Sequence, residues 1–259
     1  MKHIESIASL ALAAALAWTV GCASPAAKPA SPTAAKHEDR AASPPAAKAE
    51  RQLTLPPGAA QPPAPFEGEG WQEMFEGQRL AGWREIPFAG HGEVHCQADA
   101  VVLGMGDPFT GITWTNEFPR QNYEVALDAM RLMGSDFFCA LTVPVGDTFC
   151  SLVVGGWGGS LVGISSLDGM DASENETTKF STFESGRWYR VRLRVTQKKI
   201  EAWIDKEKLV DVAIGEHKIA LRFGDIEMCA PVGLAAWQTS SALREIRYRR
   251  VTGPAGKGD

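Results

Sequence analysis

A tryptophan cleared of neighbouring side chains stands directly before a dense polar run in this sequence. Trp157 lies between two glycine pairs in the run 155–159, and the polar run 165–179 follows after a short apolar segment. Glycines lack Cβ atoms and so let a ligand approach the backbone closely. The carboxylates, amide and hydroxyls of 165–179 are groups that bond sugar hydroxyls, hold a hard cation or move protons. We therefore expect the functional site within 155–179.

The elements that would position this site are β-strands. Runs rich in β-branched and aromatic residues recur between Gly, Asp and Pro turns, and no segment shows a sustained helical repeat. Many strands at short spacing predict an all-β sandwich or jelly roll. The expected strands are 94–96, 100–103, 112–115, 123–133, 137–143, 149–154, 161–165, 188–196, 200–205, 209–214, 219–222, 232–237 and 243–251.

One hairpin can be predicted residue by residue. A turn at 197–198 pairs Val191 with Ile204, and it brings the arginines of the preceding strand onto the opposite face. There the register predicts two cross-strand ion pairs and one cation–π contact. They are Arg190 with Asp205, Arg194 with Glu201, and Arg192 with Trp203. The arginine stripe is thus better explained as a ladder on a sheet face than as a phosphate-binding patch.

The four cysteines downstream of the leader fix no disulfide pattern. They are Cys96, Cys139, Cys150 and Cys229. An exported chain could pair them, and free buried thiols are equally compatible with the spacing. A hairpin turning at 144–147 places Cys150 opposite Leu141, so the register does not favour a bond between Cys139 and Cys150.

The ends of the chain indicate export and a tether. A basic start and a short apolar run precede Cys22, and residues 1–22 resemble the signal peptide and lipobox of bacterial lipoproteins, in which this cysteine carries lipid. A plain cleavable signal is the alternative. Residues 23–65 are rich in Ala and Pro and predict a disordered linker, residues 66–251 predict one domain, and 252–259 a disordered tail.

The composition bears on partners and location. Seven of the eight tryptophans lie in 66–251, and the net charge of −5 argues against nucleic acid as a partner. The expected location is the bacterial cell envelope, with the protein held by an N-terminal lipid on the outer membrane or facing the periplasm. The sequence leaves the oligomeric state open.

Several passages resemble one family. Residues 70–83 (GWQEMFEGQRLAGW) are similar to the opening of the 3-keto-disaccharide hydrolase domain family, which has the pattern Leu-Phe-x-Gly-x-x-Leu-x-Gly-Trp. Residues 114–118 (WTNEF), leading into 123–125, resemble its Trp-Thr-x-Glu-Tyr segment. Residues 231–234 (PVGL) and 243–247 (LREIR) resemble its ending. The resemblance spans nearly all of 66–251.

The resemblance implies a concanavalin A-like jelly roll that acts on glycosides oxidised to a ketone at C3. The middle of the chain departs from the family. Many members carry a Glu-x-Gln strand where this chain has the regions 155–159 and 168–179. Near the end, 237–239 stands where others carry an Asp-His-Gly turn. Catalytic residues therefore do not transfer by position from the family.

The implied chemistry assigns candidate roles within the polar run. A ketone at C3 acidifies the C2 proton, so the bond at C1 can break by elimination, after which water adds. Asp171, Glu174 and Glu176 are the candidate acids and bases, and Lys179 could supply positive charge. A divalent cation bound by Asp168 and Asp171 is the other expected source of positive charge, and the only cofactor we consider.

Further residues are candidates for binding the sugar. Trp157 and Trp237 could present ring faces, and Asn175 and Gln238 could bond hydroxyls. Purely structural roles compete with these. The spacing from Ser173 to Glu176 also fits a capping box, and the tryptophans could be core aromatics at sheet edges.

A second place for a metal is the alternating set His91, Glu93 and His95. On a strand these side chains would share a face, but Gly90 and Gly92 favour a loop. The sequence as a whole favours an exported carbohydrate-active protein that cleaves 3-keto-glycosides. A non-catalytic carbohydrate-binding module and an envelope scaffold that binds protein are the other interpretations.

Overall fold

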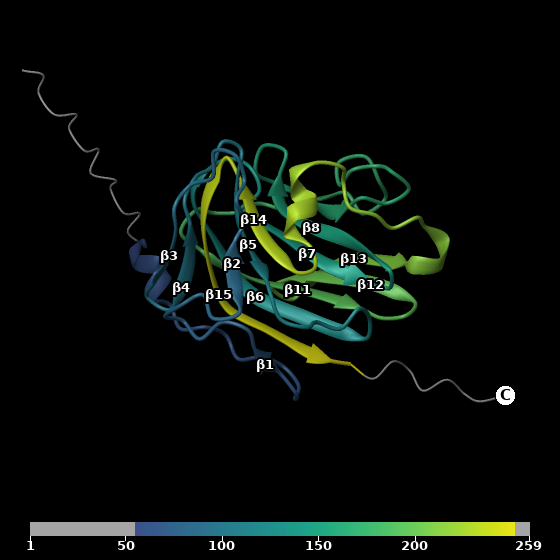
Figure 1. The fold of residues 1–259 in the computed structure, drawn as a ribbon, viewed down its shortest axis with the longest axis horizontal. Coiled ribbons are helices and arrows are strands. Elements are labelled where there is room, and N and C mark those ends of the chain that lie inside the picture. The colour runs from purple at the N-terminus through teal and green to yellow at the C-terminus, as the bar shows by residue number, and fades with distance from the viewer. Residues whose placement is uncertain (1–54, 252–259) are drawn as a thin grey trace, which may run out of the picture. The chain divides into compact units, whose positions relative to one another are not determined.

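The computed structural model describes residues 55–251, and every structural statement below concerns this part of the chain (Figure 1). It is built from strands and three short 3-10 helices, without an α-helix. The 3-10 helices are η1 (Pro57–Ala60), η2 (Ile214–Glu216) and η3 (Asp225–Cys229). No helix there is long and apolar enough to cross a membrane. The predicted signal peptide with Cys22, most of the linker and the C-terminal tail lie outside the described residues.

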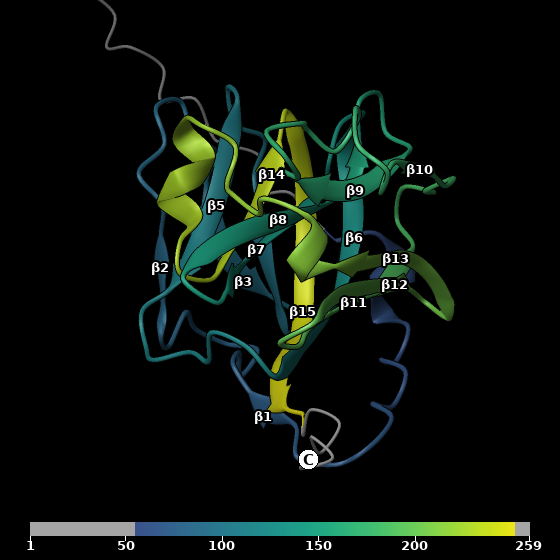
Figure 2. The same cartoon turned by 90° about the vertical axis from the view of Figure 1, so that its right-hand side faces the viewer.

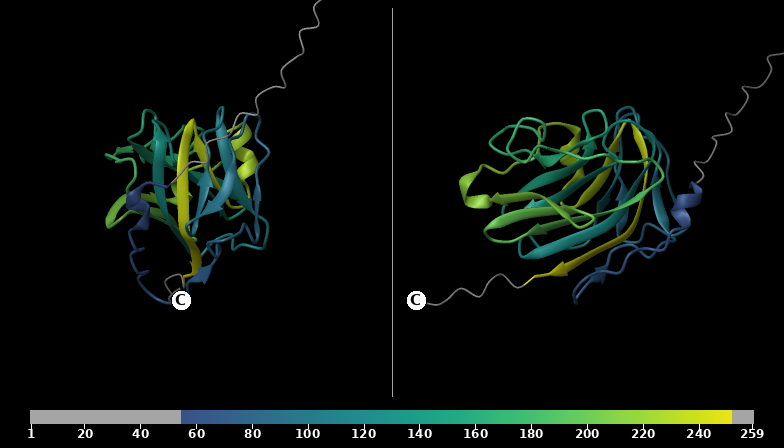
Figure 3. Two further views of the ribbon diagram at one scale, coloured as in Figure 1. Left: turned by 90° about the vertical axis from the view of Figure 1, so that its left-hand side faces the viewer. Right: turned by 180° about the vertical axis from the view of Figure 1, so that it is seen from behind.

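The strands form two antiparallel sheets that pack face to face, as the views in Figure 2 and Figure 3 show. The eight-stranded sheet holds β13 (Glu207–Ala213), β12 (Lys199–Ile204), β11 (Trp188–Val195), β6 (Tyr123–Gly134), β15 (Thr239–Arg250), β4 (Ala100–Leu103) and β3 (Val94–Gln97) in this order, with β1 (Gln72–Glu73) paired to β15. The seven-stranded sheet holds β10 (Lys179–Phe180), β9 (Leu161–Ser165), β8 (Thr148–Gly156), β7 (Cys139–Val145), β14 (Gly233–Trp237), β5 (Phe109–Trp114) and β2 (Trp83–Glu85).

The main core lies between the two sheets. Alternate residues of each strand point inward, such as Leu152 and Val154 of β8 and Val191 and Leu193 of β11, and all four are fully buried. Burial of these side chains is the dominant stabilising contribution, at roughly 25 cal/mol per Å² of apolar surface. The jelly-roll sandwich expected from the sequence is confirmed.

Most predicted strands are present, but one is absent and one hairpin turns at a different place. Residues 219–222 form no strand, since only Ile219 makes an isolated bridge, to Leu167. Strand β7 runs two residues further than expected before its hairpin with β8 turns, so that Val143 pairs with Cys150. Pro144 lies on the strand because β14 pairs only with residues 140–142 of β7, and no neighbour on that side needs its missing N–H.

The predicted hairpin of β11 and β12 is confirmed in its register, with Val191 opposite Ile204. The ion pair of Arg194 with Glu201 and the contact of Arg192 with Trp203 are also present. The predicted ion pair of Arg190 with Asp205 is wrong. Arg190 pairs with Asp128 of β6, and Asp205 pairs with Arg187. Asp205 Oδ1 accepts the backbone N–H of Arg190 and not its guanidinium.

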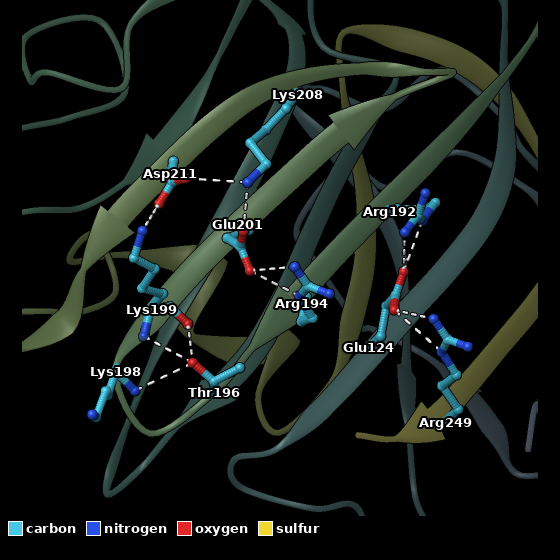
Figure 4. A network of polar contacts seen from close by, with 10 residues as sticks. All are labelled: Glu124, Arg192, Arg194, Thr196, Lys198, Lys199, Glu201, Lys208, Asp211 and Arg249. Carbon is cyan, nitrogen blue, oxygen red and sulfur yellow. Dashed lines mark hydrogen bonds and ion pairs between the residues drawn. The ribbon is translucent and has the colours of Figure 1, made fainter. Parts of the chain in front are cut away.

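The outer face of the eight-stranded sheet carries a network of arginines around buried carboxylates (Figure 4). Glu124 is fully buried and lies between two arginines on the neighbouring strands. Its Oε1 accepts from Arg192 at 2.7 Å, and its Oε2 accepts from Arg249 at 2.7 Å. The same arrangement recurs at Asp128, with Arg190 and Arg244, and at Glu201, with Arg194 and Lys208. These arginines are bound within the fold, as the ladder interpretation requires.

A segment that the sequence assigns partly to the linker lies against this arginine face. We call residues 55–67 the strap. The carbonyl of Ala64 accepts a hydrogen bond of 2.7 Å from Arg190. The ring of Phe66 lies against two guanidinium groups. Its centroid is 4.0 Å from Cζ of Arg190 and 4.8 Å from Cζ of Arg247. Cation–π contacts of this kind hold the strap on the sheet.

The four cysteines among the described residues are free. Three of them, Cys139, Cys150 and Cys229, are fully buried, and burial raises the pKa of each thiol to about 12. A thiol with so high a pKa forms little thiolate and reacts slowly. These side chains act as small apolar core residues.

Candidate functional site

A groove of about 640 Å³ lies on the outer face of the seven-stranded sheet. Small side chains at the centre of that face form its floor, namely Ala140 of β7, Ser151 and Val153 of β8, and Ser165 of β9. Larger residues from the ends of neighbouring strands and from the surrounding loops form its walls. The volume is within the range of pockets that take small molecules. The groove is therefore the candidate functional site.

One wall of the groove is aromatic. Trp237, at the end of β14, lies edge-on against Phe109 of β5, with ring centroids 4.6 Å apart, and Phe137 packs beside both. All three side chains line the groove. Asp225 and Ile226 of η3 line it as well, and η3 contacts β5 and β14. Aromatic rings held in fixed positions offer a large apolar contact area, which suits the apolar face of a sugar ring.

Trp157 stands on the rim, on the turn between β8 and β9. Its side chain is 42% exposed, and its backbone has φ of 46°. A left-handed conformation is uncommon for a bulky residue and costs about 1–3 kcal/mol, a strain that clusters at functional positions. The glycines on either side leave the indole unobstructed, as expected from the sequence.

Arg131 holds this turn from the other sheet. It is a buried residue of β6, and its Nη2 donates to the carbonyls of Gly159 at 2.7 Å and Gly155 at 3.3 Å. Its guanidinium also lies 5.1 Å from the ring centroid of Phe138, and burial lowers its pKa. These bonds fix the backbone that carries Trp157.

The opposite wall is polar and centres on Asp171. Its Oδ1 accepts hydrogen bonds from the Ser165 hydroxyl at 2.6 Å and the Ala172 N–H at 2.8 Å. Its Oδ2 pairs with Nη1 of Arg222 at 2.7 Å. Asp171 is thus held in place, while the Arg222 side chain is 62% exposed and keeps further N–H donors for a ligand.

Glu174 also lines the groove, and its environment differs from that of Asp171. Its side chain is exposed, and its carboxylate accepts no hydrogen bond and forms no ion pair with any residue in 55–251. Both of its oxygens can therefore accept a proton from a ligand. Two carboxylates lie in one wall, one committed to Arg222 and one free to act as a base.

Asn175 is part of the frame of this loop. Its Nδ2 donates to the carbonyls of Ile164 and Asp171, and its Oδ1 accepts from the Thr177 N–H and hydroxyl. The side chain is buried and does not line the groove. The region 171–178 forms turns, so the capping box suggested by Ser173 and Glu176 is not formed.

Asp168 and Glu176 lie on either side of His217, outside the groove. His217 Nδ1 is 2.7 Å from Asp168 Oδ2, and its Nε2 is 3.2 Å from Glu176 Oε1. The Lys218 N–H donates to Asp168 Oδ1 at 2.7 Å. We call this group the clamp, since it joins the loop that carries Asp171 to the segment that carries Arg222.

The clamp makes stability depend on pH. The hydrogen bond with Asp168 raises the pKa of His217 and lowers that of Asp168. A raised imidazole pKa adds stability that is complete below the ordinary value of 6.5 and is lost as the pH rises through the raised pKa. The Asp168 contribution is present above the ordinary value of 3.8 and is lost as the pH falls. Stability from the clamp is therefore greatest between these two values.

We expect His217→Gln to lower the melting temperature more at about pH 5.5 than at about pH 8.5. The measurement is thermal unfolding of both proteins at each pH. The control is His91→Gln, which replaces an exposed imidazole whose Nδ1 contacts only the neighbouring Gly92 carbonyl. An equal loss at both pH values would show that the imidazolium does not hold the clamp.

Lys179 and Gln238 are not brought to the groove. Lys179 lies on β10 at the edge of the sheet, beside Glu176 in a separate depression. Gln238 follows Trp237, and its N–H donates to the Pro108 carbonyl, but its side chain does not line the groove. Of the eight residues proposed for catalysis or sugar binding, the structure gathers Asp171, Glu174, Trp157 and Trp237.

The arrangement of donors does not suit a metal ion. Both proposed ligands are engaged, Asp168 with His217 and Asp171 with Arg222. Across residues 55–251, no three His, Cys, Asp or Glu side chains lie together as a metal site would need, and this includes His91, Glu93 and His95. The positive charge in the groove is that of Arg222.

Sequence reasoning missed Arg222 and its neighbour Phe223, which is 91% exposed at the lip of the groove. Their segment is a short apolar run ending in one cation, and this pattern favours a strand. The available signal was Gly224 followed by Asp225, a pair that is typical of turns.

Two solved structures to which the chain is similar are a carbohydrate-binding module and a β-glucanase. A carbohydrate-binding module of Bacillus subtilis, CBM66, is 11% identical over 65% of this chain and 95% of its own, with a TM-score of 0.45. A β-glucanase of Bacillus licheniformis is 8% identical over 71% and 100%, with a TM-score of 0.47. Such values carry no information about what the groove binds.

Comparison with curated proteins finds no match. Comparison with protein families matches residues 70–252 to the 3-keto-alpha-glucoside-1,2-lyase-like domain. The matched range includes both sheets, the groove and all the residues of its walls. The chain therefore belongs to the 3-keto-alpha-glucoside-1,2-lyase-like domain family.

Proposed function

We propose that the groove binds a glycoside carrying a ketone at C3 and cleaves it by elimination followed by hydration. The supporting observation is the polar wall, where the free carboxylate of Glu174 lies beside the Asp171–Arg222 pair. Family membership supports a carbohydrate substrate. The aromatic wall offers a surface on which the sugar ring can stack.

In this proposal, Glu174 removes the proton at C2, which the neighbouring ketone acidifies. The electron pair of the C2–H bond forms a double bond between C2 and C3, which gives an enediolate. The guanidinium of Arg222 stabilises the negative charge on O3. The C1–O bond then breaks to give an enone, and the leaving oxygen takes the proton from Glu174. Water adds its hydroxyl at C1 and a proton at C2, which completes a net hydrolysis.

Asp171 has a positioning role in this scheme. Three hydrogen-bonding partners hold its carboxylate, and one of them is Arg222. The pair holds the guanidinium through Nη1 and leaves its other N–H donors free. Asp171 is therefore less suited than Glu174 to accept the C2 proton.

The test is to incubate the protein with a disaccharide oxidised at C3 of one ring, and with the unoxidised sugar, in deuterated water. We expect cleavage of the oxidised sugar alone, with deuterium incorporated at C2, measured by NMR. Cleavage of both sugars without incorporation would contradict the elimination route. Sugar binding without turnover would instead establish a carbohydrate-binding module, which the aromatic wall alone would suffice to support.

We further propose that the protein is exported and attached to the cell envelope through lipid on Cys22. The support is the sequence of residues 1–22. Labelling with a radioactive fatty acid tests this, since Cys22→Ser should abolish incorporation.

A further inference from the structure

A second hollow of about 540 Å³ adjoins the groove. Four residues line both spaces, namely Asp171, Glu174, Arg222 and Phe223. These residues form a ridge, and three of them are the ones that carry the proposed chemistry. The two spaces therefore meet where a bond would be broken.

The two spaces differ in character. The groove contains the aromatic side chains of Phe109, Phe137, Trp157 and Trp237. Beyond the ridge, the hollow has a more polar lining, formed by Ser166, Asp168 and Lys218 together with Gly169, Ala220 and Leu221. Phe223 is its only aromatic residue, and it lies on the ridge.

The geometry of the reaction indicates which part of the substrate each of the two spaces holds. The base must reach the proton at C2, and C1, which bears the leaving group, is the neighbouring carbon. With Glu174 on the ridge and the reacting ring in the aromatic groove, the leaving group extends across the ridge. It then occupies the hollow.

We propose that the hollow is a subsite for the leaving group and that it selects a polyhydroxylated group over a flat aromatic one. This rests on the function proposed above. Lys218 is exposed, and no residue in 55–251 bonds its ammonium group, so its three donors are available to hydroxyl oxygens. The other charged groups of the hollow are paired, Asp168 with His217 and Asp171 with Arg222, apart from the base Glu174.

The experiment compares three substrates that share one 3-keto ring and differ in the leaving group: a sugar, a phenyl group and a methyl group. We expect Lys218→Met to lower kcat/KM for the disaccharide about 10-fold, which is the effect of losing one hydrogen bond to a charged group. The change should appear as a higher KM. The phenyl and methyl glycosides should change less than about twofold, because neither presents hydroxyls to the subsite. The control is Lys198→Met, an exposed lysine at the turn of the β11–β12 hairpin that does not line the hollow.

Equal losses for all three substrates, or no loss for the disaccharide, would overturn the subsite. Failure of the wild-type protein to cleave any of them would contradict the proposed function instead. The subsite is then tested by calorimetry with an unoxidised disaccharide and the matching methyl glycoside. Tighter binding of the disaccharide that Lys218→Met removes would support it, and equal affinities would overturn it.

Discussion

Glu174→Gln is expected to lower kcat for a 3-keto-disaccharide by about 10²- to 10⁴-fold, the range that a positioned general base contributes. The amide has nearly the shape of the carboxylate but cannot take the proton from C2. Because Glu174 accepts no bond from any described residue, the loop should keep its structure. The measurement is steady-state turnover, together with the rate of deuterium exchange at C2.

A matched control is Glu227→Gln, since this exposed carboxylate belongs to η3 and lies outside the groove lining. Its turnover should equal that of the wild type. If Glu174→Gln kept more than about a tenth of the wild-type rate, Glu174 would not be the base. Asp171 would then be the carboxylate to test, with the complication that its replacement also frees Arg222.

The largest effect on stability is expected at Glu124, far from the groove. Glu124→Gln keeps the volume of the side chain but removes the charge between Arg192 and Arg249. The new amide would also direct its N–H donors toward a guanidinium, which has no acceptor for them. Breaking a buried ion pair by changing one partner costs about 3–5 kcal/mol, because the remaining charge is left uncompensated. Urea unfolding measures this loss.

The reference substitution for Glu124 is Glu207→Gln, an exposed position on β13, which should change the free energy of unfolding by less than about 0.5 kcal/mol. Both variants should keep the same dependence on denaturant as the wild type. A loss below about 1 kcal/mol at Glu124 would mean that water reaches the arginines and replaces the carboxylate.

The sequence predicted the fold well where alternation was strong. In β11, buried and half-buried residues alternate from Arg190 to Val195, and this pattern together with a turn at 197–198 predicted the register with β12. The prediction failed where one residue suited two conformations. The fixed φ angle of Pro144 favours a turn at this residue. The chain turns instead at Gly146-Asp147, and Pro144 stays on β7.

The site could be predicted only in part, for a physical reason. Trp157, Asp171 and Glu174 lie within 18 residues of one another, and their composition marked them. Arg222 reaches Asp171 through tertiary contacts between two loops, which no local pattern encodes. The arginine ladder shows the same limit, because Asp128 on a third strand pairs with Arg190 in place of the expected partner.

The strap and the groove lie on the outer faces of different sheets, which has a practical consequence. The strap contacts Arg190 and Arg247 of the eight-stranded sheet, while the groove opens on the seven-stranded one. A cysteine or biotin handle introduced near Pro63 would therefore fix the domain to a sensor surface with its groove facing the solution. Immobilised in that orientation, the protein could be screened against arrays of oxidised sugars without blocking the site.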